Sequence, residues 1–113
     1  MPIINEIDLV EHGAGRVPAL QNLDLEAGNV AAGKDGVGFD THLRSVSNPV
    51  VFSAGDAAAT CGPPLAPVSA LGGKVVAANL LGGDIAAAKY AGIPSAVFTI
   101  PALTRVAGAR TRH

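Results

Sequence analysis

The sequence predicts an α/β fold, and three stretches of the 113-residue chain support that prediction. Residues Val50–Ala54 form an unbroken apolar run, rich in β-branched and aromatic side chains, which is typical of a fully buried strand in a parallel sheet. Residues 67–81 repeat apolar side chains at helical spacing, and Pro67 stands in the first turn, where helices favour proline. Recurring glycines between Gly28 and Thr41 indicate a short β-meander. We therefore expect a meander, a buried strand and a following helix.

Ahead of the meander, residues Ile7–His12 predict a strand that leads into a tight loop at Gly13–Gly15. The next residues, Arg16–Pro18, do not open a helix. The loop therefore lacks the helix N-terminus on which a Gly-x-Gly-x-x-Gly motif binds a phosphate. Arg16 is either an exposed loop cation or a residue that contacts the phosphate of a ligand. Residues 19–26 fit either a short helical turn or an extended segment, and the sequence does not separate the two.

The predicted buried strand follows a polar turn at Ser45–Pro49 and stops abruptly at Gly55 and Asp56. In open α/β sheets, ligands bind just beyond the carboxyl ends of the strands, and a glycine allows the backbone to approach them closely. Gly55 and Asp56 are thus either part of a ligand site or a simple turn. Composition alone favours the turn.

A loop over residues 57–64 ends in paired prolines, which exclude regular helix there. The helix 67–81 then ends at Gly82–Gly83, which supply a C-cap. Gly72 and Gly73 inside this helix each cost roughly 1 kcal/mol relative to alanine. Such a cost is tolerated where something approaches the helix closely, and either a ligand or a neighbouring sheet fits that role.

The carboxyl-terminal third of the chain carries one further predicted strand, residues 94–100, after a linker at 84–92. No regular element is predicted for residues 102–113, which are small and basic. If strand 94–100 is the edge of a larger sheet, it leaves backbone groups and apolar side chains unpaired, which favours association of the isolated chain.

Composition excludes several classes of function. The formal net charge is −1 and aromatic residues make up 4%, so the chain has neither the basic stripe nor the stacking face of a nucleic-acid-binding protein. Its apolar stretches are too interrupted to span a bilayer, and its first residues lack the basic region of a signal peptide. The single cysteine, Cys61, cannot form an intramolecular disulfide and fits a reducing cytoplasm. His12 and His42 have no spacing that suits a metal site, and no catalytic constellation is visible.

Four motifs occur in a characteristic order along the chain. Phe52–Asp56 has the form of an apolar strand that ends in Ala-Gly-Asp. About ten residues later, Leu65–Val68 begins the helix that contains Gly73–Lys74. Upstream stands Gly15–Pro18, and downstream stands Val97–Pro101. Together these motifs resemble the second flavin segment and its flanks in the pyridine nucleotide-disulfide oxidoreductases, a family that includes glutathione reductase, mercuric reductase and dihydrolipoamide dehydrogenase.

The resemblance implies a partial FAD/NAD(P)-binding Rossmann-like fold, with FAD as cofactor and NAD(P)H as the reductant of a full-length parent. Residues 1–90 would be the end of the NAD(P)-binding domain plus the second FAD-binding segment. Residues 91–113 would start the interface domain, through which a full-length parent forms a homodimer.

The resemblance also implies a set of cofactor-binding residues and neither a catalytic residue nor a metal ligand in this chain. Asp56 would accept hydrogen bonds from ribityl hydroxyls, and the N–H groups of Ala66 and Val68 would face the carbonyl end of the flavin ring. Where the family usually has threonine, this chain has Ala66, so a hydroxyl role is lost there. The expected cofactor-binding residues are Gly15, Gly55, Asp56, Ala66, Pro67 and Val68.

The expected function is therefore part of a flavin-dependent oxidoreductase that passes electrons from NAD(P)H through FAD to a disulfide-type or related acceptor. The first Gly-x-Gly-x-x-Gly motif, the Cys-x-x-x-x-Cys pair and most of the interface domain do not occur in this sequence. The chain alone is thus expected to be inactive. The alternative is a non-catalytic flavin-binding or dimerisation module, or a decayed remnant of such an enzyme.

Overall fold

The structure, a computed structural model, describes residues 8–106 and contains both helix and strand, as expected. Residues 1–7 and 107–113 lie outside the described residues, so the start of the predicted strand 7–12 and the outer ends of the two predicted domains are not described. In chain order, the elements are β1 (Ala32–Gly33), β2 (Gly36–Val37), the 3₁₀ turn η1 (Gly55–Ala57), α1 (Ala66–Gly82), β3 (Pro94–Val97) and β4 (Leu103–Val106).

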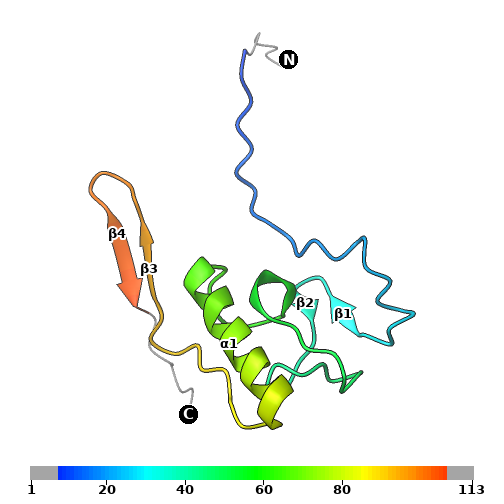
Figure 1. The fold of residues 1–113 in the computed structure, drawn as a ribbon. Helices are drawn as coiled ribbons and strands as arrows, with labels where there is room; N and C mark the ends of the chain where they lie inside the picture. The colour runs from blue at the N-terminus through cyan, green and yellow to red at the C-terminus, as the bar shows by residue number, and fades with distance from the viewer. Residues whose placement is uncertain (1–7, 107–113) are drawn as a thin grey trace, which may run out of the picture.

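Helix α1 is the centre of the molecule, with η1 and the β1–β2 hairpin on one side and the β3–β4 hairpin standing apart on the other (Figure 1). Its observed range, Ala66–Gly82, extends the predicted helix 67–81 by one residue at each end. Pro67 lies in its first turn, as expected. Gly83 caps its C-terminus with a φ of 78° and donates its N–H to the carbonyl of Asn79. Local signals therefore set both ends of the helix.

The buried face of α1 differs from the predicted apolar face. Val68 and Val75 are buried as the spacing predicts, but Leu81 is 91% exposed. The other buried positions are Gly72 and Asn79. The reason is that α1 packs closely against the segment at Ala54 through Gly72. The helix therefore turns the face that carries Gly72 inward, and Leu81 points to solvent. A Cβ on Gly72 would lie 3.1 Å from the Cβ of Ala54.

The predicted buried strand Val50–Ala54 is wrong. Val50 lies in a turn and is 80% exposed, and the N–H of Val51 donates to the carbonyl of Asn48. Within this run, only Phe52 forms a ladder contact, an isolated antiparallel bridge to Arg44. The pairing around this bridge is short: the Ser45 N–H donates to the Val51 carbonyl at 2.8 Å, and the Ser53 N–H donates to the Leu43 carbonyl at 3.1 Å. The end of the run lies against α1, where Ala54 faces Gly72.

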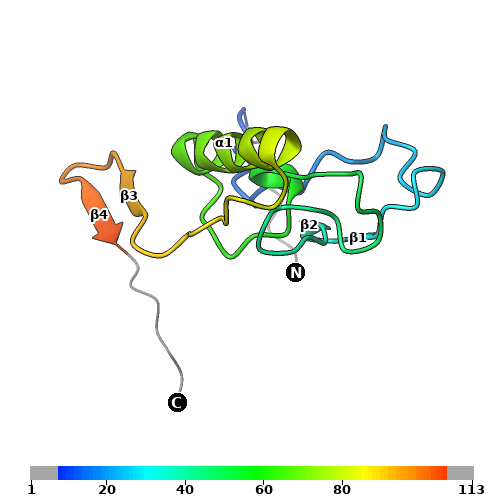
Figure 2. The ribbon, with the colours of Figure 1, turned by 60° about the horizontal axis from the view of Figure 1, so that its bottom comes forward.

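Strand pairing is mostly antiparallel rather than parallel. β1 pairs with β2, with Ala32 opposite Val37, which confirms a small hairpin inside the expected meander. β3 pairs with β4, with Pro94 opposite Val106. Among residues 8–106, the parallel contact is an isolated bridge between Val37 and Ala58, which connects β2 to the end of η1. Figure 2 shows α1 lying over η1, with the β1–β2 hairpin below.

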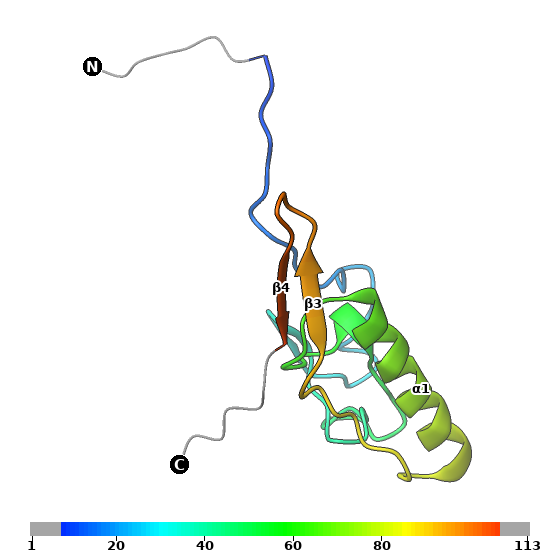
Figure 3. The same cartoon turned by 90° about the vertical axis from the view of Figure 1, so that its left-hand side faces the viewer.

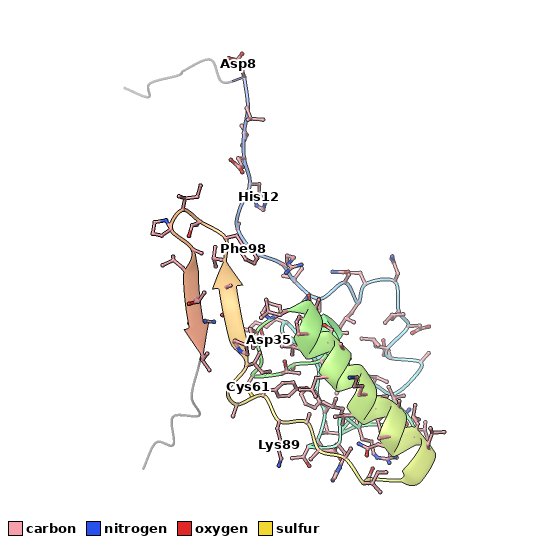
Figure 4. The ribbon with its side chains drawn as sticks, turned by 60° about the vertical axis from the view of Figure 1, so that its left-hand side comes forward. Asp8, His12, Asp35, Cys61, Lys89 and Phe98 are labelled. Carbon is pink, nitrogen blue, oxygen red and sulfur yellow. The ribbon has the colours of Figure 1, made fainter. Side chains whose placement is uncertain are left out.

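Two segments differ from expectation near the ends of the described chain. Residues 8–12 run as an exposed extended arm without strand pairing, and Asp8 and His12 lie along it in Figure 4. Residues 103–106, for which no element is predicted, form β4 beside the predicted strand at 94–100, whose observed range is 94–97. In Figure 3 this hairpin stands in front of the rest of the molecule.

The core is small and partly polar. Its buried apolar side chains are Val37, Leu43, Ala58, Val68 and Val75. Asn79, 2% exposed, uses both ends of its amide: Nδ2 donates to the carbonyls of His42 and Ala86, and Oδ1 accepts from the Ala86 N–H, all at 2.8 Å. These hydrogen bonds connect α1 to Ala86 in the linker that follows it and to His42 in the loop before Phe52.

Leu43 occupies the centre of the core in an uncommon backbone conformation. It is fully buried and has a φ of 63°. The Asp40 carboxylate stabilises this turn by accepting hydrogen bonds from the N–H groups of His42 and Arg44, at 2.8 and 3.0 Å. The leucine is thereby held beneath Gly72, where a Cβ would lie 3.6 Å from its Cδ1.

Candidate flavin-binding depression

A depression of about 550 Å³ opens where four separate segments of the chain meet. Its walls come from the loop 15–18, the β1–β2 turn, η1 with the following loop, and the first turn of α1. Its lining residues are Gly15, Arg16, Val17, Pro18, Lys34, Asp35, Gly55, Asp56, Ala58, Thr60, Gly62, Pro63, Pro64 and Val68. The volume lies within the usual range for small-molecule sites in proteins.

The structure brings four of the six expected site residues to this depression: Gly15, Gly55, Asp56 and Val68. The loop 15–18 is more than 35 residues away in sequence from Gly55, so folding alone joins them. Ala66 and Pro67 do not line the depression but lie exposed at the adjoining start of α1. The roles of these six residues toward a cofactor stay predictions.

Gly55 is required by both conformation and space. Its φ is 68°, which a residue with a side chain rarely adopts. An added Cβ would lie 2.9 Å from the Oγ of Ser69, on the first turns of α1. The glycine therefore lets η1 pack directly against α1, and this contact fixes Asp56 next to the helix start.

Asp56 is exposed at the middle of η1. Within the described part of the chain, its carboxylate forms no hydrogen bond and no ion pair; the ion pair found there joins Arg44 to Asp84. Both oxygens are therefore free to accept hydrogen bonds from a ligand that carries hydroxyl groups.

The start of α1 offers fewer free donors than expected. The Val68 N–H donates to the carbonyl of Leu65 at 3.0 Å, so it already has an acceptor, and Pro67 has no N–H. The Ala66 N–H has no acceptor among the residues described. At this helix end, the partial positive charge is thus presented to a ligand mainly through Ala66.

Sequence reasoning missed the part of the depression formed by Lys34, Asp35 and the loop 60–64. The Gly-Lys-Asp-Gly pattern around Lys34 does indicate a tight hairpin turn. Nothing local in the sequence shows that the hairpin folds against η1. Gly62 also contacts Tyr90, since a Cβ there would lie 2.9 Å from the tyrosine ring, and burial raises the pKa of Tyr90.

Other reactive side chains do not form a second site among residues 8–106. Cys61 is exposed and unpaired, and no group of three His, Cys, Asp or Glu residues is placed to hold a metal ion in that range. The Nδ1 atom of His42 lies 2.9 Å from the carbonyl of Ala86, which is a structural contact. No helix in this part of the chain is both long enough and apolar enough to cross a membrane.

Comparison with known proteins supports the family suggested by the motifs. The chain is 51% identical over 84 residues to an uncharacterized 19.7 kDa protein in a mercuric resistance operon of Staphylococcus aureus; the match covers 74% of this chain and 47% of that protein. It is 34% identical over 101 residues to the mercuric reductase of Staphylococcus aureus, covering 89% of this chain and 18% of the reductase. No protein-family profile matches the sequence.

A solved structure has the same fold over most of the chain. The flavoprotein disulfide reductase RclA from Escherichia coli, in its Cu(II) complex, superposes with a TM-score of 0.69 at 24% sequence identity, over 87% of this chain and 22% of RclA. The chain thus spans about half the length of the 19.7 kDa relative and about a fifth of the length of the reductases. Motifs, sequence relatives and fold agree, and together they support the pyridine nucleotide-disulfide oxidoreductase family over the part of these proteins that the chain covers.

Proposed function

We propose that this chain forms part of the flavin site of an FAD-dependent oxidoreductase, which passes electrons from NAD(P)H through FAD to a disulfide-type or related acceptor. One observation carries the proposal. Gly15, Gly55, Asp56 and Val68, which belong to motifs far apart in the sequence, line a single depression. The similarity of the chain to mercuric reductase and to the flavoprotein RclA makes a flavin the ligand to test first.

The residues present fit part of a flavin. Asp56 supplies two unpaired carboxylate oxygens for ribityl hydroxyls, and Ala66 supplies a backbone N–H at a helix start for a ring carbonyl. Gly15, where an added Cβ would meet nothing within 4 Å, leaves its backbone open to a ligand. Gly55 lets η1 pack against α1, and Pro67 shapes the first turn of that helix. When bound, a flavin supplies the redox chemistry, and this chain binds and orients it.

The proposal places the catalytic partners outside this sequence. The chain has one cysteine and therefore no redox-active pair of its own. Hydride and thiol chemistry both require groups held against one flavin face, so we expect the purified chain to show no NAD(P)H-dependent disulfide reductase activity. The single cysteine is also the basis for proposing a cytoplasmic setting.

Two domains are part of the same proposal. Residues 1–90 would contribute the Rossmann-like, flavin-facing portion, and residues 91–113 would begin an interface domain that forms a homodimer in a longer protein. The β3–β4 hairpin supports this division because it follows an irregular linker and carries uncovered apolar side chains, with Phe98 92% exposed beyond the end of β3 (Figure 4).

A non-catalytic flavin-binding module is the second candidate. The relative with 51% identity is a 19.7 kDa protein, of which this chain covers 47%, against 18% of the mercuric reductase. A protein of that size has little room for a second nucleotide domain. A neighbouring reading frame that encodes a Cys-x-x-x-x-Cys segment would favour the enzyme, and its absence would favour the module.

Titration of FAD with the purified chain tests both candidates, with flavin fluorescence as the readout. Saturable quenching at a 1:1 ratio is the expected result. The absence of saturable quenching up to about 1 mM chain, equivalent to a binding free energy weaker than about −4 kcal/mol, would contradict the flavin site.

A further inference from the structure

The depression has a charged rim that the family motifs leave largely unassigned. Arg16 and Lys34 contribute two cations, and Asp35 and Asp56 contribute two carboxylates. All four side chains are exposed, and none of them pairs with another, since the ion pair found among residues 8–106 is Arg44–Asp84. Four unpaired charges around one hollow leave both signs available to a ligand.

The hairpin that carries Lys34 is held against η1 by contacts of β2. Lys34 lies in the turn between β1 and β2, two residues before Gly36. Gly36 has a φ of 120°, and an added Cβ would lie 2.5 Å from the carbonyl oxygen of Ala57. The Ala59 N–H also donates to the carbonyl of Val37 at 3.1 Å. The hairpin turn is therefore fixed against η1, the element that carries Asp56.

We propose that Lys34 binds the phosphate of a phosphorylated flavin in this depression, together with Arg16. The inference rests on the proposed flavin site and names the part of the ligand that the rim recognises. Asp56 repels a phosphate and accepts hydroxyl groups, so the hydroxyl-bearing part of the ligand belongs beside Asp56. The two cations are the remaining groups of the rim that attract an anion, and a Lys ammonium binds phosphate as a point charge.

Asp35 opposes this role and provides a second test of it. Its carboxylate stands next to Lys34 in the same turn and on the same rim, so it weakens the attraction for a phosphate. Asp35→Asn is therefore expected to raise the affinity for a phosphorylated flavin while leaving an uncharged one unaffected.

The experiment compares riboflavin, FMN and FAD as ligands in fluorescence titrations of the full chain. Lys34→Gln is expected to weaken FMN binding about threefold to tenfold, a range set by an exposed charge-assisted contact, and to leave riboflavin binding unchanged. Lys34→Arg keeps the charge and should keep most of the FMN affinity. Lys89→Gln, on the exposed linker and away from the depression (Figure 4), is the matched control and should change nothing.

Salt gives an independent readout on the unaltered chain. The affinity for FMN should fall as ionic strength rises, and the affinity for riboflavin should not. If flavins bind but Lys34→Gln and salt affect FMN and riboflavin alike, the phosphate role of Lys34 is wrong and the flavin site stands. If no flavin binds at all, both proposals are wrong.

Discussion

Substitution by alanine is expected to have different effects on stability at Gly72 and Gly73 of α1, because only Gly72 packs against another segment of the protein. A Cβ on Gly72 would lie 3.1 Å from the Ala54 Cβ, whereas a Cβ on Gly73 would meet nothing within 4 Å. Alanine at either position gains roughly 1 kcal/mol of helix propensity. At Gly72, overpacking costs about 1–3 kcal/mol, which cancels or outweighs that gain. We expect Gly73→Ala to raise the free energy of unfolding by up to about 1 kcal/mol, and Gly72→Ala to leave it unchanged or lower it by up to about 2 kcal/mol.

Urea denaturation followed by circular dichroism measures both variants against the unaltered chain. The comparison also bears on the site, because the contact at Gly72 sets the spacing between α1 and the segment that carries Gly55 and Asp56. Equal stabilisation by the two alanines would show that α1 does not pack on Ala54, and the geometry described for the depression would then be refuted.

Three further predictions concern the elements that support the site. Gly36→Ala should lower the free energy of unfolding by more than about 2 kcal/mol, because its Cβ would lie 2.5 Å from a backbone oxygen, while Gly33→Ala, in open space, should change it little; equal effects would contradict the hairpin packing. Asn79→Ala removes three 2.8 Å hydrogen bonds from a buried amide and should cost about 2–4 kcal/mol in the same assay; a cost below about 1 kcal/mol would count against this linkage. The hydrogen bond from Arg44 lowers the pKa of the Asp84 carboxyl from 3.8. The ion pair between the two side chains therefore contributes its full stabilisation above pH 3.8 and loses it as the pH falls through the lowered pKa. Arg44→Gln should remove this part of the acid dependence, and identical acid titrations of the two chains would disprove it.

The sequence predicts the elements whose ends carry local signals. Pro67 and the Gly82–Gly83 pair fix α1 to within one residue of the expected range, and the glycine-rich stretch yields a hairpin. The strand expected at Val50–Ala54 fails because apolar composition does not specify a partner. In the structure, Val50 is 80% exposed, Phe52 lies against Arg44, and the contact of the run with α1 falls on Ala54. β4 escapes prediction because its alternating residues carry a weak pattern that becomes a strand only beside β3.

For the site, motif residues are predictable and their surroundings are not. The motifs identify Gly15, Gly55 and Asp56 from the sequence alone, and all three line the depression. Lys34 lines the depression only because the β1–β2 hairpin docks onto η1. These two segments are about 20 residues apart in sequence, and no local pattern encodes their contact. The Val68 N–H is expected to be free, and only the geometry of the first helical turn shows that Leu65 takes it.

The affinity of Asp56→Asn for FAD tests the central claim most directly. The substitution keeps the shape of the side chain but replaces a charged acceptor by a neutral amide. Hydrogen bonds to charged groups contribute roughly 1.5–3 kcal/mol, so the exposed Asp56 should account for about a tenfold change in the dissociation constant. Asp8→Asn, on the extended arm, makes the same chemical change away from the depression and should leave the affinity unchanged. A tenfold weaker binding of FAD by Asp56→Asn alone is the predicted result, and unchanged FAD affinity in a folded Asp56→Asn chain would show that Asp56 is only a turn residue.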